Sequence, residues 1–300
     1  MNDHGTRQPG IAHHPMLRDI LLPWVNEASG RGPLRAARAL AEAFDAHVRI
    51  LAAVDVPMPM PTDWGGMSYD LYARMHEDAH ARNAALVARL REAHAREGAR
   101  VEVRSTESIA MHPAATAALH ARHADLVVVP TAPMGDAQSG PALSWFGDLL
   151  IHGGRPVLAV PEGMNVDGLP RRALVAWKPT AQAARAVHDA LPLLRDADTV
   201  EVLAIDAAIG GGADGSNAYG EEPGADIAAH LARHGLDVQV TTRPSMDFSV
   251  AHEIVKHAGR SGAQLIVAGG YGHSRLREFA LGGATREFMQ CTDIPILFSH

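Results

Sequence analysis

Cysteine, long apolar segments and clusters of basic residues are scarce in this 300-residue sequence. Cys291 is the single cysteine, so no intrachain disulfide can form. Its position after Phe288 and Met289 favours a buried apolar role over a reactive thiol. No apolar run of about 18 residues indicates a membrane-spanning helix, and no basic region precedes a hydrophobic signal core. We therefore expect a cytoplasmic protein.

The charge balance and the polar residues exclude several classes of function. A formal net charge of −7 and the absence of a Lys/Arg-rich block disfavour nonspecific binding to nucleic acid. Eighteen histidines suggest metal binding, but His252 and His257 are five positions apart, whereas two zinc ligands on one helical face are four apart. Ser144 is not a nucleophile elbow, because the glycine two residues before it is missing. No catalytic set and no metal site are expected.

An internal repeat divides the sequence into two halves. Residues 124–129 match 263–268 at an offset of 139, and residues 18–24 match 171–177 at an offset of 153. The first half therefore carries fourteen additional residues midway. Such self-similarity predicts two domains with the same fold, and the length of the chain suits two domains. The predicted parts are a disordered tail at 1–15 and domains at 16–161 and 171–300.

Short apolar segments alternate with helical patterns in both halves. Asp247 or Ser249 is a candidate cap for a helix that runs to His257, and Gly262 is expected to end it. A long helical pattern fills 69–96. This alternation predicts α/β domains, each doubly wound around a mainly parallel five-stranded sheet, with ligands beyond the carboxyl ends of the strands. The predicted strands are 20–22, 48–54, 101–104, 126–129, 157–160, 173–177, 200–205, 238–242, 265–268 and 296–298.

Glycines at three points around one turn and helix start make the segment 265–285 the most informative in the chain. Its first four residues form an unbroken apolar run, which is typical of a parallel strand covered on both faces. Gly269, Gly272 and Gly282 follow with the spacing Gly-x2-Gly-x9-Gly. Glycine lets the backbone approach a ligand, and a helix that begins near Gly283 directs N–H groups and a positive dipole end at the same anion. The segment predicts a phosphate cradle.

Other glycine motifs fit this segment less well. A dinucleotide fingerprint has its three glycines within six residues at the first strand–helix turn, whereas this motif follows the fourth strand of its half. The Walker pattern needs Gly-Lys-Ser/Thr, which does not occur. An alternative interpretation is that these glycines only form turns and cap helices.

The spacing resembles the nucleotide-binding signature of the universal stress protein family, whose usual form is Gly-x2-Gly-x9-Gly followed by Ser or Thr. Gly283 stands where the family has the hydroxyl that meets a phosphate. A charge-assisted hydrogen bond is worth roughly 1.5–3 kcal/mol. Its loss is expected to lower the affinity for ATP about tenfold or more, unless Thr285 or Ser274 supplies a hydroxyl instead. The resemblance covers nearly the whole chain, so the chain looks like a tandem member with an adenine-nucleotide alpha-hydrolase-like fold.

The resemblance implies that ATP or another adenine nucleotide binds the second half. Many members carry an aspartate at the end of the first strand, where this chain has Lys178, a point cation for a phosphate. His273, Ser274 and Arg275 follow the glycine turn as in many members and offer donors to phosphate oxygens. The expected nucleotide-binding residues are Lys178, Gly269, Gly272, His273, Ser274, Arg275, Gly282, Gly283 and Thr285.

The first half has lost the cradle. Pro130, Pro133 and Leu143 occupy the three glycine positions. Proline lacks the N–H that an anion would use, and leucine brings a side chain into the approach path. We expect a degenerate half that binds no nucleotide. The family's last strands commonly pair between partners, so residues 156–160 and 295–298 are expected to pair within this chain.

Three functions follow from these expectations. The leading hypothesis is a stress-response protein that binds an adenine nucleotide as a conformational signal. A nucleotide-free interaction scaffold with an unknown protein partner is the second, and a weak ATPase is the third.

Overall fold

The computed structural model describes most of the chain, including both ends of the sheet but only part of the glycine segment. The predicted tail at 1–15 and five predicted nucleotide contacts, Gly272, His273, Ser274, Arg275 and Gly282, lie outside the described residues. The described residues are 16–26, 29–56, 69–95, 100–109, 112–137, 139–164, 166, 168–205, 222–244, 249–271 and 283–300.

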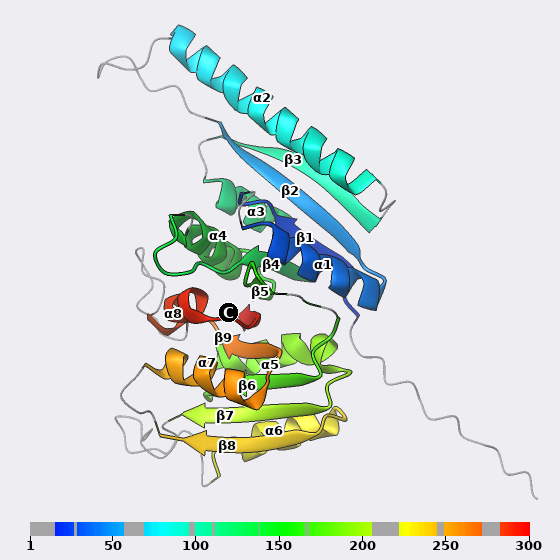
Figure 1. The fold of residues 1–300 in the computed structure, drawn as a ribbon, viewed down its shortest axis with the longest axis vertical. Coiled ribbons are helices and arrows are strands. Elements are labelled where there is room, and N and C mark those ends of the chain that lie inside the picture. Colours follow the sequence, from blue (N-terminus) through cyan, green and yellow to red (C-terminus); the bar gives the residue numbers. More distant parts are fainter. Residues whose placement is uncertain are drawn as a thin grey trace, which may run out of the picture.

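The strands form one continuous ten-stranded sheet, along which the two halves of the sequence follow one another (Figure 1). The order is β3-β2-β1-β4-β5-β10-β9-β6-β7-β8, so each half has the same strand order, read outward from the centre. All neighbours are parallel except β5 and β10. The strands are β1 (Asp19–Pro23), β2 (His47–Val56), β3 (Val101–Ile109), β4 (Leu126–Pro130), β5 (Val157–Val160), β6 (Arg172–Ala176), β7 (Thr199–Ile205), β8 (Val238–Arg243), β9 (Leu265–Gly269) and β10 (Ile296–Ser299).

Helices cover both faces of the sheet, as the unbroken apolar strands predict. One core lies under α1, α2, α5 and α6, and the other lies under α3, α4, α7 and α8. Ile20 and Leu22 of β1 point into the first core and Leu21 into the second. The helices formed by the described residues are α1 (Arg31–Phe44), α2 (Tyr69–His94), α3 (Pro113–Ala121), α4 (Ser139–His152), α5 (Ala181–Leu194), α6 (Ala225–Arg233), α7 (Val250–Ser261) and α8 (Gly283–Cys291).

The two halves meet at a seam between β5 and β10. The predicted pairing of these strands is present, with Leu158 opposite Leu297 in an antiparallel register. On the α1/α5 face, the Arg195 guanidinium lies 4.3 Å from the centre of the Phe44 ring and donates a hydrogen bond to the Ala43 carbonyl oxygen. The pairing hides two strand edges that would otherwise attract other chains.

The predicted helix boundaries around α7 are also present. Ser249 caps this helix by accepting a hydrogen bond from the His252 N–H, and Gly262 ends it with a φ of 71°. Among the described residues, no helix is long and apolar enough to cross a membrane.

Candidate nucleotide-binding site

The described part of the predicted site lies at the carboxyl edge of the second half's strands. β6 has β9 on one side and β7 on the other, so the strand order reverses direction between β6 and β9. Ala176 at the end of β6 is in register with Ala268 in β9, which brings Lys178 and Gly269 to the same edge. Ligands of open α/β sheets bind in the crevice at such a reversal.

The amino end of α5 approaches this crevice directly at Gly269. A Cβ atom at Gly269 would lie only 2.6 Å from the backbone nitrogen of Ala183 and 2.8 Å from the carbonyl carbon of Gln182. Gly269 does not have a positive φ, so close packing of the helix, rather than a sharp turn, requires glycine here. Thr180 caps α5 by accepting a hydrogen bond from the Ala183 N–H. A helix amino end in this place favours an anion.

Among the described members of the predicted set, Lys178 and Gly283 are exposed. Lys178 lies between the end of β6 and the Thr180 cap of α5, at the carboxyl edge of the strands. Gly283 begins α8, and no atom of the described residues outside that helix's backbone lies within 4 Å of the position of a Cβ there. Packing against the described residues therefore does not require glycine at 283.

Thr285 is buried and already holds the chain end of β9. Its side chain is among the buried polar groups, and its Oγ1 accepts a hydrogen bond from the Tyr271 N–H at 3.4 Å. Tyr271 has a φ of 56°, a conformation that non-glycine residues seldom adopt. The hydroxyl thus helps to fix the backbone immediately before Gly272. Direct contact between Thr285 and a phosphate remains a prediction.

Tyr271 is a site neighbour that sequence reasoning missed. Its ring packs edge-on against His300, and its hydroxyl lies 3.1 Å from the position of a Cβ at Gly147 in α4. Burial, with a smaller contribution from the nearby Asp148 carboxylate, raises the pKa of Tyr271 to about 12. The base of the glycine segment is therefore anchored on a helix of the other half. Its place between two glycines was the only signal in the sequence.

Comparisons with known proteins give the fold. No family model and no curated protein matches the chain. A universal stress protein from Archaeoglobus fulgidus DSM 4304 superimposes with a TM-score of 0.68 at 15% identity, covering 95% of this chain and 96% of that one. The fold is that of the universal stress proteins.

Two structures from Pseudomonas aeruginosa support the same fold along nearly the whole chain. A putative universal stress protein from strain UCBPP-PA14 gives a TM-score of 0.57 at 15% identity, covering 94% of this chain and 93% of that one. A functionally unknown protein from strain PAO1 gives 0.56 at 15% identity, covering 94% and 92%. Each match spans both halves, which agrees with the repeated strand order.

The first half of this universal stress protein fold presents a different carboxyl edge. The Glu162 carboxylate accepts a hydrogen bond at 2.9 Å from the Gly32 N–H in the first turn of α1. Arg35 holds the same segment by donating to the Glu162 and Met164 carbonyl oxygens. The chain therefore places its own anion at the helix end that corresponds to the amino end of α5. Sequence reasoning missed Glu162, because 130 residues separate it from Gly32.

The cavity at this edge is small and acidic. Its volume is about 90 Å³, and Asp136 and Glu162 are among its lining residues together with Pro130 and Pro133. Leu143, the residue at the third glycine position, is buried in α4. Two carboxylates repel a phosphate, and ligand pockets usually measure about 300–1,000 Å³.

The histidine and cysteine candidates have structural explanations. His257 Nε2 lies 2.7 Å from a Glu201 carboxylate oxygen, which also accepts a hydrogen bond from the Thr241 hydroxyl. No group of three or more potential metal ligands gathers within the described ranges. Cys291 is half-buried, and burial raises the pKa of its thiol, which lowers the thiolate fraction.

Proposed function

We propose that the chain is a tandem universal stress protein whose second half binds ATP or another adenine nucleotide as a regulatory signal. The observation that carries this proposal is the amino end of α5, which packs directly on Gly269 at the strand-order reversal. Lys178 adds a cation on the same side, and the Gly-x2-Gly-x9-Gly segment continues from this strand end. These groups suit a chain of phosphates.

Hydrolysis is not part of this proposal. A weak ATPase stays an alternative, which turnover abolished by a site substitution would favour. The nucleotide-free interaction scaffold is the other alternative, and it predicts that neither half retains a nucleotide.

Mass spectrometry of small molecules released from the purified full-length protein tests the proposal. We expect an adenine nucleotide, and isothermal titration calorimetry should then give saturable binding of ATP to stripped protein. GTP serves as the control for the base. Binding of neither nucleotide at millimolar concentration would reject nucleotide sensing and leave the scaffold.

Gly272→Val tests the motif itself. Its methyl groups are expected to occupy the space that phosphate needs, so ATP binding should be lost. If Gly272 has a positive φ, valine also costs about 1–2 kcal/mol, which two packed domains tolerate. Equal ATP affinities of the folded variant and the wild type would eliminate the cradle.

A further inference from the structure

A second cavity lies at the seam, at the opposite edge of the sheet from the predicted nucleotide site. It has a volume of about 370 Å³ and lies among α1, β5, α5, the start of β9 and the connection between the two halves. Leu265, which lines it, begins β9, whereas Gly269 ends that strand. Four residues of strand separate the two by roughly 13 Å. The seam cavity is therefore distinct from the glycine cradle.

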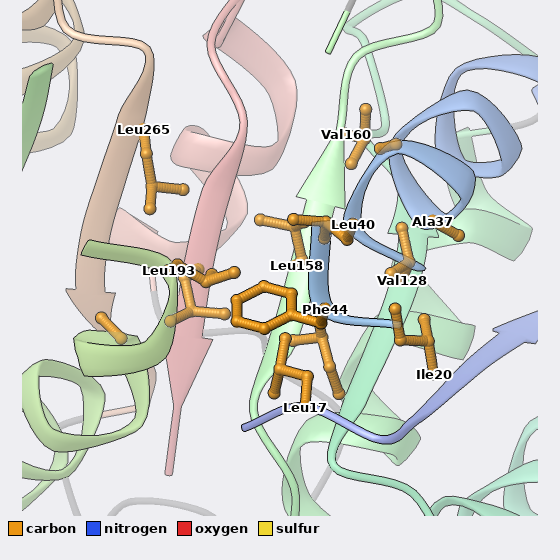
Figure 2. Packing of buried hydrophobic residues seen from close by; sticks show 14 of the residues in the cluster. Leu17, Ile20, Ala37, Leu40, Phe44, Val128, Leu158, Val160, Leu193 and Leu265 are labelled. Carbon is orange, nitrogen blue, oxygen red and sulfur yellow. The ribbon is translucent and has the colours of Figure 1, made fainter. Parts of the chain in front are cut away.

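The walls of the seam cavity are mainly aliphatic. Leu40 and Leu158 come from the first half, and Leu193 and Leu265 come from the second (Figure 2). All four are buried to at least 97%. The cavity is partly open to solvent, and its lining is more apolar than polar. Its volume lies in the range of small-molecule pockets, which are lined mainly by apolar side chains with a few polar groups.

The roof of the cavity is the connection between the halves, which is fastened to α1. Met164, Val166 and Leu169 line the cavity from this side. The Arg35 guanidinium donates hydrogen bonds to the carbonyl oxygens of Glu162 and Met164. The Glu162 carboxylate accepts a further one from the amino end of α1. These contacts fasten this end of the connection to the first turns of α1.

The polar side chains in the lining are donors of one kind. Among the described residues that line the cavity, Arg171 and Gln264 have the polar side chains, and none of these residues is a carboxylate. The Gln264 side-chain oxygen already accepts hydrogen bonds from the Arg171 and Arg172 N–H groups, which leaves its amino group to donate. The Arg171 guanidinium is 63% exposed and is held at the rim by the Asp198 carboxylate and the Asp196 carbonyl oxygen.

We propose that the seam cavity binds a small amphipathic carboxylate, such as a medium-chain fatty acid. Its hydrocarbon chain lies between the connection, with Met164, Val166 and Leu169, and the buried leucines, and its carboxylate stays at the rim beside Arg171 and the Gln264 amino group. Since residues of both halves and of their connection form the walls, an occupant stabilises the seam between the halves. This binding does not depend on the nucleotide proposed above.

Calorimetry with straight-chain ligands on the full-length protein tests the proposal. Each methylene buried is worth about a fourfold gain in affinity, so octanoate should bind about fifteenfold more tightly than hexanoate. Octanoate should also bind more tightly than octylamine, because the rim presents donors. Equal affinities for hexanoate and octanoate, a preference for octylamine, or no octanoate binding up to its solubility would each overturn the proposal.

Two pairs of variants locate the ligand. Arg171→Gln should lower the affinity for octanoate about fivefold, because an exposed ion pair contributes modestly to binding. The affinity for octanol, which has no charge, should stay unchanged. Arg172→Gln is the matched control, since Arg172 is adjacent but does not line the cavity. Leu169→Trp should abolish binding of both ligands by filling the space, while Leu119→Trp on the exposed surface of α3 should not.

Circular dichroism and thermal unfolding establish that the variants fold. If Leu169→Trp does not fold, Val166→Phe fills the same cavity from the roof. Unchanged octanoate affinity in a folded, cavity-filled variant would show that the carboxylate binds elsewhere and would reject the seam site.

Discussion

Two glycines of the predicted cradle have different physical reasons to be glycine. At Gly269, a methyl group would lie closer to the α5 backbone than Cβ atoms occur in proteins. At Gly283, a side chain would meet no atom of the described residues beyond its own helix. The first position is therefore set by packing of the fold, and the second is open to change.

Gly269→Ala should destabilise the protein without removing a ligand contact. Its methyl group displaces the first turn of α5, and overpacking of this kind typically costs about 1–3 kcal/mol. Gly259→Ala is the control, because Gly259 lies inside α7 with open space around it and alanine there should stabilise by about 0.5–1 kcal/mol. Thermal unfolding measures both. A melting temperature of Gly269→Ala at or above that of the wild type would contradict the close approach.

Gly283→Ser should strengthen ATP binding about tenfold, since it restores the hydroxyl of the family signature and one charge-assisted hydrogen bond. The open space at Gly283 means that the new side chain costs little in packing. Gly140→Ser, in the first turn of α4 and equally open, should leave ATP affinity unchanged. Calorimetry decides, and a weaker or equal affinity for Gly283→Ser would place the phosphate away from the α8 start.

At the scale of elements, much of the fold could be predicted from the sequence. The apolar runs placed both ends of nine of the ten strands to within two residues, because parallel strands buried on both faces carry a continuous apolar signal. The long helix predicted over 69–96 is α2, which ends at His94. The pairing of β5 with β10 followed from the repeat and from the family's habit.

The second part of β3 was not predictable in this way. The strand continues to Ile109, whereas the apolar pattern ended at Arg104. Ser105, Thr106 and Glu107 pair with β2 in a continuous register, but they lie on a strand at the edge of the sheet and carry no apolar pattern. The pairing partner, and not local hydrophobicity, sets this strand's length.

The contacts around the candidate site were equally hidden, because they join distant parts of the chain. Tyr271 packs on α4 and Glu162 occupies the amino end of α1, and neither contact follows a sequence spacing. Lys178 and Gly269, in contrast, follow from the strand ends and lie at one edge as predicted. Sequence spacing predicts which residues lie at the same edge of the sheet. Tertiary packing decides which of them already contact another part of the chain.

The burial of Tyr271 against α4 predicts that its phenol loses its proton at a higher pH than an exposed tyrosine. Burial keeps this phenol neutral in the folded chain and raises its pKa from 10.0 to about 12. Its contribution to stability is therefore full below pH 10 and is lost as the pH rises towards 12. The tyrosinate absorbance of the wild type minus that of Tyr271→Phe should show a midpoint near 12. A difference midpoint at the ordinary value would mean that the hydroxyl is solvated and does not pack on α4.

At the scale of the whole molecule, one continuous sheet joins the two halves, whose carboxyl edges carry different groups. The seam contains paired strands, the Arg195–Phe44 contact and the Tyr271–α4 contact, so a change at the glycine segment has a direct packing route to the first half. In the first half, the Glu162 carboxylate already accepts a hydrogen bond from the amino end of α1. If the second half binds a nucleotide as proposed, the first half is the part that receives such a change.

This asymmetry predicts that the full-length chain binds no more than one nucleotide. The first half offers a cavity of about 90 Å³ lined by Asp136 and Glu162, with proline where N–H donors would be needed. Calorimetry with ATP should therefore give a stoichiometry of one or less per chain. Glu162→Gln keeps an acceptor for the Gly32 N–H but removes the charge, and it should leave the stoichiometry unchanged, because volume and missing donors still exclude phosphate. Two nucleotides per chain would show that the first half binds as well and would contradict the asymmetry. One nucleotide retained by Gly272→Val at wild-type affinity would assign binding to the first half and invert the roles of the two halves.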